Sequence, residues 1–242
     1  MTDKPIFGPV ERSRRLSDIV AETMSVRILN DDALAPGTIL PSERELAQQF
    51  EVSRTVIREA VLSLAAKGIV DVKSGSGARV ALLDGTAASE ALAIYIRGGG
   101  HAYEKVHEVR MTIETEMAGL AAERRTSAHL TAMRSRYSDF ISLVGHDVDA
   151  ATQADVDFHD TIALATGNEV FIVILGSIRD ALLDVRRRNI GGGMADEIVE
   201  QHGEIMAAIE RGDRAEAVSA MRAHLTSVAN FRVHVDDNAD PS

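Results

Sequence analysis

The N-terminal third of the chain contains three short helical patterns followed by a hairpin. Apolar positions recur every three or four residues over three stretches, about 12–31, 43–50 and 54–66. Ser42 and Glu45 form a Ser-x-x-Glu capping box at the start of the second stretch, and Gly68 ends the third. Two strand-like runs follow, about 69–72 and 78–82, joined by a turn rich in serine and glycine. Two short helices at a three-residue turn and then a hairpin are typical of a winged helix-turn-helix module.

Beyond residue 85 the strand signals stop, and long amphipathic helical patterns take their place. These patterns cover about 86–97, 103–125, 127–144, 149–166, 169–189, 194–211 and 213–231. The breaks between them are short, and two contain glycine triplets, at 98–100 and 191–193. Long helices joined by short breaks predict an antiparallel bundle. The expected fold class is therefore mainly α, with an N-terminal winged helix-turn-helix followed by an all-helical antiparallel bundle.

The length of 242 residues favours two domains over one. We expect a winged helix-turn-helix domain over 10–82, a linker with a first connecting helix over 83–102, a helical domain over 103–232 and a disordered tail over 233–242. Charge is divided in the same way. Residues 1–80 hold 11 basic and 11 acidic side chains, whereas the rest hold 15 basic and 26 acidic ones, which accounts for the whole net charge of −11. This asymmetry indicates that the two parts have different roles.

Composition excludes several classes of protein. Because the chain has no cysteine, it has neither a disulfide scaffold nor a thiolate metal site. No apolar run approaches the roughly 18–20 residues that span a bilayer, and the first twenty residues lack a signal-peptide core. We therefore expect a soluble, cytoplasmic protein without a membrane partner.

The third helical pattern carries polar side chains suited to DNA. Arg54, Thr55 and Arg58 lie in its first turn and a half, away from its apolar stripe. An arginine can bond to both O6 and N7 of guanine, or it can bind a phosphate. Arg44 lies at the start of the preceding helix, where it can reach a phosphate, and the turn at 74–75 offers small residues where a wing would touch DNA. Each arginine alone could equally be solvated surface, so the prediction rests on the whole set.

Three motifs follow one another in this module: Leu40-Pro-Ser-Glu-Arg-Glu-Leu-Ala47, Val52-Ser-Arg-Thr-Val-Ile-Arg-Glu-Ala60 and Leu64-x-x-x-Gly68-Ile-Val. Together they resemble the DNA-binding domain of the GntR family of bacterial transcription regulators. The resemblance implies that double-stranded operator DNA is contacted by Arg44, Arg54 and Arg58, with assistance from Ser53, Thr55, Ser74 and Gly75. The wing departs from the family pattern at Ala78-Arg79, where a threonine–aromatic pair is common.

Three histidines lie on the apolar stripes of three different helical patterns: His159, His202 and His224. Asp155 precedes the first of them by one turn and shares its helix face. Three imidazoles and a carboxylate can converge as a cluster that suits Zn, Ni, Co, Mn or Fe. Each histidine alone could instead be a satisfied core residue, so the metal hypothesis requires that they converge. The other five histidines lack this combination of setting and partner.

Further motifs lie in the helical region: Val109-Arg-Met-Thr-Ile-Glu114, Asp155-x-x-Phe-His159, Glu200-Gln-His202-x-x-Ile and Met221-Arg-Ala-His224-Leu. They resemble the effector-binding domain of the FadR subfamily, often abbreviated FCD, over about 100–230. The resemblance implies one divalent metal ion per chain, with zinc favoured and nickel, manganese, cobalt or iron also compatible. The ligands that it implies are Asp155, His159, His202 and His224.

Arg110 lies on an apolar stripe, where an unpaired charge would be costly. Its partner is either Glu114, one turn later, or a bound anionic effector. In the family that the chain resembles, the corresponding arginine lines the ligand pocket, which implies a small carboxylate held by Arg110 and the metal. The basic run at 186–188 is interpreted as a solvated helix end that is favoured by the helix dipole.

The leading functional hypothesis is a metal-containing transcription regulator, a repressor rather than an enzyme. Helix-turn-helix regulators read pseudo-palindromic operators as dimers, so a homodimer is expected. Its effector would be a small organic or sugar acid that lowers operator affinity. Two alternatives stay open: a metalloenzyme that uses the Asp/His3 site to activate water, and a direct sensor of the metal ion.

Overall fold

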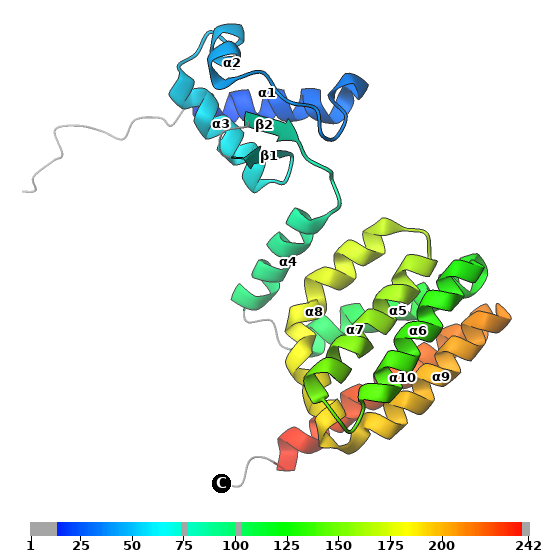
Figure 1. The fold of residues 1–242 in the computed structure, drawn as a ribbon. Helices are drawn as coiled ribbons and strands as arrows, with labels where there is room; N and C mark the ends of the chain where they lie inside the picture. Colours follow the sequence, from blue (N-terminus) through cyan, green and yellow to red (C-terminus); the bar gives the residue numbers. More distant parts are fainter. Residues whose placement is uncertain (1–13, 74–76, 100–102, 239–242) are drawn as a thin grey trace, which may run out of the picture. The chain divides into compact units, whose positions relative to one another are not determined.

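The computed structural model describes residues 14–73, 77–99 and 103–238, with the last seven of these in their backbone only (Figure 1). The chain forms two compact units, Met1–Ala87 and Ala88–Ser242. This division falls inside 83–102, the segment predicted to hold a linker and a connecting helix. Among the described residues, no helix has the length and apolar character needed to cross a membrane.

The first unit is a small helical module with a two-stranded hairpin. Its elements are α1 (Leu16–Asn30), a 3₁₀ turn (Asp32–Leu34), α2 (Glu43–Gln49), α3 (Arg54–Ala66), β1 (Val70–Lys73) and β2 (Gly77–Val80). The predicted capping box of α2 is present: the Glu45 N–H donates to the Ser42 hydroxyl at 3.3 Å, and the Glu45 carboxylate accepts from the Ser42 N–H at 2.9 Å. β1 and β2 pair antiparallel, as expected for a wing. The predicted winged helix-turn-helix fold is confirmed.

The core of this unit fixes the orientation of α3. Ile57, Ala60 and Leu64 are fully buried on one face of the helix and pack with residues of α1 and the strands. Gly68 takes a φ of +68° just after the helix, a conformation that glycine adopts without strain. The opposite face of α3 is therefore left open to solvent.

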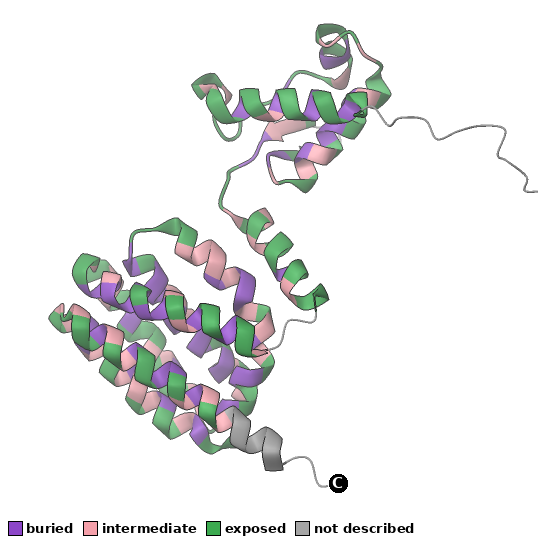
Figure 2. Ribbon diagram, turned by 180° about the vertical axis from the view of Figure 1, so that it is seen from behind, coloured by how far each residue is buried: buried purple, intermediate pink, exposed green. Residues whose placement is uncertain are grey.

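The second unit is a helical bundle. Its elements are α4 (Thr86–Gly98, whose first two residues lie in the first unit), α5 (Tyr103–Arg124), α6 (Ser127–Leu143), α7 (Val148–Ala165), α8 (Glu169–Asn189), a π-helical turn (Ile190–Met194), α9 (Ala195–Arg211) and α10 (Arg214–Asn238). The helix pairs that pack together most extensively are α6 with α7, α5 with α10 and α9 with α10. Buried residues lie on the faces that these helices turn towards one another (Figure 2). The predicted all-helical bundle is confirmed.

Two details differ from the sequence prediction. The glycine triplet at 191–193 is not a loop between two helices but part of the π-helical turn that joins α8 directly to α9. Ile190 and Met194 at the ends of this turn are buried at 5% and 2% exposure, and their packing holds it in place. At the C-terminus, α10 continues to Asn238, inside the segment predicted to be a disordered tail, because neither glycine nor proline occurs in 233–238.

The kink between α8 and α9 depends on Gly193. Its φ is +106°, and a Cβ built on it would meet no atom within 4 Å, so its requirement for glycine is conformational rather than steric. The kinked segment brings the end of α8 and the start of α9 into one hydrophobic cluster, which contains Ile190, Met194 and Ile198.

We predict that Gly193→Ala lowers the free energy of unfolding by about 1–2 kcal/mol, the cost of a positive φ for a residue with a Cβ. The matched control is Gly98→Ala, because Gly98 is helical and also has open space around its Cβ position. The control should be neutral or stabilising by up to about 1 kcal/mol. Urea unfolding followed by circular dichroism measures both. Equal stabilities of the two variants would contradict the conformational role of Gly193.

Candidate functional site

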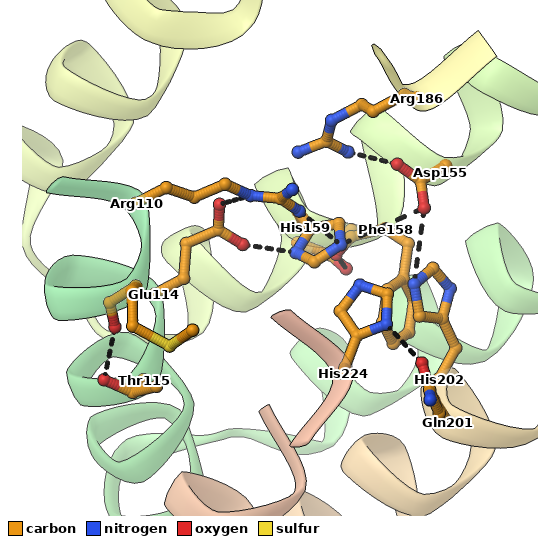
Figure 3. A network of polar contacts seen from close by, with 12 residues as sticks. Arg110, Glu114, Thr115, Asp155, Phe158, His159, Arg186, Gln201, His202 and His224 are labelled. Atoms are coloured by element: carbon orange, nitrogen blue, oxygen red, sulfur yellow. Dashed lines mark hydrogen bonds and ion pairs between the residues drawn. The ribbon is translucent and has the colours of Figure 1, made fainter. Parts of the chain in front are cut away.

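The structure brings the three predicted histidines together. His159 of α7, His202 of α9 and His224 of α10 point into one space between their helices (Figure 3). One ring nitrogen of each lies within 4.8 Å of those of the other two, and no side chain is more than 1% exposed. The ring of His202 stacks on Phe158 at a centroid distance of 4.4 Å and lies 5.2 Å from that of Phe140. Aromatic packing therefore holds the ring of His202 in place.

Asp155 lies at the edge of this cluster. Its Oδ1 is 3.3 Å from Nε2 of His202 and 4.0 Å from Nε2 of His159. Its other oxygen accepts a charge-assisted hydrogen bond from Arg186 of α8. The carboxylate is 3% exposed, so the predicted fourth ligand adjoins the histidines while also neutralising an arginine.

Two side chains outside the cluster orient two of its three rings, those of His159 and His224. Oε2 of Glu114 lies 2.5 Å from Nδ1 of His159, and Oε1 of Gln201 lies 2.9 Å from Nδ1 of His224. An oxygen acceptor at Nδ1 places the proton there and leaves Nε2 with a free lone pair, the arrangement found in carboxylate–histidine–metal triads. The sequence did not indicate either histidine contact, because both join separate helices.

The donor set fits a divalent metal ion. Nε2 of His224 is buried and has no hydrogen-bond partner, and Nε2 of His202 has only Oδ1 of Asp155 nearby, at 3.3 Å. A buried polar atom left unsatisfied costs about 1–3 kcal/mol, so the Nε2 of His224, beside the other two histidines, indicates a ligand that this cluster can hold. Imidazole nitrogens with a carboxylate are the ligands that zinc and similar ions accept.

Burial also sets the protonation states. It lowers the pKa of His202 to about 3 and that of His224 well below its ordinary value. For Asp155, burial acts to raise the pKa, but the positive charge of Arg186 outweighs it and holds the pKa well below its usual range. At neutral pH these two imidazoles are neutral and the carboxylate is ionised, which are the states that metal ligation requires.

Arg110 of α5 borders the same space, at 3% exposure. Its Nε donates to Oε1 of Glu114 at 2.6 Å, and its Nη2 lies 3.5 Å from Nε2 of His159. Of the two partners considered from the sequence, Glu114 is the one in contact. Because the second oxygen of Glu114 contacts His159, this single carboxylate joins the arginine to the histidine cluster.

The prediction that the basic run at 186–188 is solvated was wrong for its first member. Arg186 is 7% exposed and ion-paired with Asp155, whereas Arg187 and Arg188 are exposed. The three residues differ because α8 turns only the first towards the bundle interior. A cavity of ≈ 10 Å³ lies beside Asp155, Arg110 and Arg186. This volume suits a single water molecule or an ion.

The candidate DNA-contacting side chains lie on the open face of the first unit. Arg44, Arg54, Thr55 and Arg58 are all exposed. Arg58 donates twice to the carboxylate of Glu43, at 3.2 and 3.1 Å, and Arg54 lies 3.8 Å from the same carboxylate. Glu43 therefore gathers two of the predicted arginines into one cluster, a role that the sequence did not indicate.

The other residues predicted to assist DNA binding are Ser53, Ser74 and Gly75. The hydroxyl of Ser53 accepts from the N–H of Val56 at 3.3 Å, so this side chain caps α3. Ser74 and Gly75 lie outside the described residues.

Comparison with known proteins agrees with this architecture. Residues 17–80 match the gntR family of bacterial regulatory proteins, and residues 105–227 match the FCD domain. The HTH-type transcriptional regulator LutR of Bacillus subtilis (strain 168) is 30% identical over 83% of this chain and 94% of its own length. The HTH-type transcriptional repressor NanR of Escherichia coli (strain K12) is 31% identical over 93% of this chain and 89% of its own.

Solved structures show the same fold. A GntR protein of Streptococcus agalactiae superposes with a TM-score of 0.66 at 28% identity, covering 89% of this chain and 99% of that one. McbR/YncC of E. coli shares the fold at 16% identity, with a TM-score of 0.51 and coverage of 93% and 100%. These matches assign the chain to a family of regulators and exclude the metalloenzyme hypothesis. The chain is a DNA-binding transcription regulator that belongs to the gntR family, with an FCD domain as its helical unit.

Proposed function

We propose that this regulator is a repressor whose affinity for its operator falls when a small organic or sugar acid binds at a metal site in the FCD domain, as the resemblance to the FadR subfamily implies. The observation that carries the proposal is the convergence of three buried histidines, joined to a buried arginine through Glu114. Zinc is the favoured ion, since nitrogen and carboxylate ligands suit it. A repressor role agrees with the name of the NanR relatives.

Two further parts of the proposal concern assembly and location. The regulator acts as a homodimer, because a helix-turn-helix protein that reads a pseudo-palindrome needs two copies of its reading helix. It works in the cytoplasm, where the operator DNA is found.

The carboxylate effector is held by Arg110. A divalent ion held by Asp155 and the three histidines would supply a Lewis acid for one oxygen of the effector. Arg110 takes the other end, and to do so its guanidinium exchanges Glu114 for the effector. Glu114 then keeps only His159 of α7 as a partner, so its contact between α5 and α7 remains, while α5 gains a new contact to the effector through Arg110. α5 follows α4, which leads from the DNA-binding unit, and a shift of α5 is therefore a route to that unit.

A direct metal sensor is the second candidate function. The observation that favours it is the cavity of ≈ 10 Å³, which is the size of an ion and too small for an organic acid as it stands. The two candidates predict different outcomes when the metal ion is added without any organic acid. Release of operator DNA by the ion alone would support the sensor.

For DNA recognition, we predict that Arg54→Ala and Arg58→Ala each weaken binding to a mapped operator by about 1–3 kcal/mol, because each loses a guanine contact. Arg44→Ala should instead weaken binding to operator and random DNA alike, as the loss of a phosphate contact does. Arg134→Ala, an exposed arginine of α6, is the control. Fluorescence anisotropy at one fixed salt concentration measures these affinities. Unchanged operator affinity in both α3 variants would contradict the assignment of the reading helix.

For metal binding, we predict about one divalent ion per chain in the purified protein. The double variant His202→Ala/His224→Ala should lose it, because two buried nitrogens are removed. The control is His146→Ala, since that histidine is exposed and lies outside the cluster. Plasma emission analysis of metal content compares the three proteins. Wild-type stoichiometry in the double variant would show that the cluster is not the metal site.

For effector response, we predict that Arg110→Gln keeps its metal and its operator affinity but no longer responds to the acid. The acid is the one that raises the melting temperature most in a panel of organic and sugar acids. In the wild type it should lower operator affinity about 5–150-fold, the range of a coupling of 1–3 kcal/mol. Arg187→Gln, an exposed arginine of α8, is the control. A full response in the Arg110 variant would leave the metal as the sole anchor.

A further inference from the structure

We propose that Arg186 is a second anion anchor in the effector pocket, so that the ligand which fits best is a small dicarboxylate with one carboxylate for each arginine. This inference rests on the proposed function, because it concerns the same pocket and the same metal. Beyond the proposed function, it specifies the charge of the effector and names Arg186 as the residue that selects for that charge.

The first observation is the position of Arg186. Its side chain is 7% exposed, lines the same cavity as Arg110 and His224, and has a buried Nε without a hydrogen-bond partner. A guanidinium stays protonated inside a protein and has five N–H donors. Its ion pair with Asp155 leaves Nε unsatisfied, so the side chain is built to hold a further acceptor.

The second observation is that two like charges are buried beside each other. Arg110 reaches the cavity from α5 and Arg186 reaches it from α8, and their guanidinium groups lie on the same side of Asp155 and His159 (Figure 3). Buried like charges repel, and an anion between them removes the repulsion.

The third observation is the sum of the buried charges. Around the histidines the buried ionised side chains of the described residues are Arg110, Arg186, Glu114 and Asp155, which sum to zero. Asp160 and Arg179, one turn away from the cluster, pair with each other and leave the sum unchanged. The histidines that hold a metal are neutral, so a divalent ion brings the site to a charge of +2.

Uncompensated charge in a buried site is costly. A monocarboxylate removes one of the two positive charges, whereas a dicarboxylate removes both. The cavity of ≈ 10 Å³ must open to admit either, and moving Arg186 from Asp155 to the ligand would make room on the side of α8, which supplies part of the cavity lining. Asp155 then keeps a cationic partner only if the metal is present, so dicarboxylate binding should depend on metal.

The test compares acids of equal carbon number but different charge. Succinate and butyrate, and malonate and propionate, are titrated by calorimetry into the zinc-loaded full-length protein. We expect each dicarboxylate to bind at least tenfold more tightly than its partner. Arg186→Gln should remove this preference by weakening the dicarboxylates alone, while the adjacent exposed arginine, changed in Arg187→Gln, should leave it intact.

Zinc content and circular dichroism establish that each variant is loaded and folded. If Arg186→Gln fails either check, Arg186→Lys is used, which keeps the charge and should retain a reduced preference. Equal affinities within each acid pair, or an equal loss for both acids in the variant, would overturn the second anchor. Binding of monocarboxylates alone overturns this inference but leaves the proposed function standing. If the wild-type protein holds no metal, the proposed function fails first.

Discussion

The interior of the helical unit depends on buried carboxylates that are each shared between an arginine and a histidine. Glu114 lies between Arg110 and His159, and Asp155 is shared in the same way on the other side of that histidine. Removing one partner from a buried ion pair costs about 3–5 kcal/mol, because a charge is left without compensation. Helices α5, α7 and α8 must therefore meet at one point, and the histidines of α9 and α10 complete it. The buried ion pairs at the centre therefore also determine how the helices of the bundle pack.

Charge pairing in the DNA-binding unit has the opposite character. Glu43 pairs with Arg58 and lies near Arg54, but both arginine side chains are more than 60% exposed. An exposed pair contributes only about 0–1 kcal/mol. A phosphate or a guanine edge can therefore take either guanidinium from Glu43 at small cost. Until then the shared carboxylate keeps the two arginines together on the open face of α3. In the helical unit buried ion pairs hold the interior together, whereas in the DNA-binding unit the exposed arginines can exchange Glu43 for DNA.

Local signals predicted much of this structure. α3 begins and ends where Ser53 and Gly68 indicated, because capping and positive φ act on neighbouring residues. The stripes of three helices were enough to suggest that their histidines converge. The burial of Arg186 was not predictable, because a basic run at a helix end looks the same whether water or a carboxylate 31 residues away accepts its hydrogen bonds. The roles of Glu43 and Gln201 likewise arise from contacts between helices, which periodicity does not encode.

The shared carboxylate of Glu114 has a consequence for what such a regulator can measure. One of its oxygens contacts the arginine proposed to hold the acid, and the other contacts a histidine proposed to hold the metal. The two binding equilibria are then linked, and linkage is reciprocal: the ion changes the affinity for the acid by the same factor as the acid changes the affinity for the ion. A cell poor in the metal would respond weakly to an abundant acid. The protein would thus report the joint supply of a nutrient and of the ion, as a coincidence detector does.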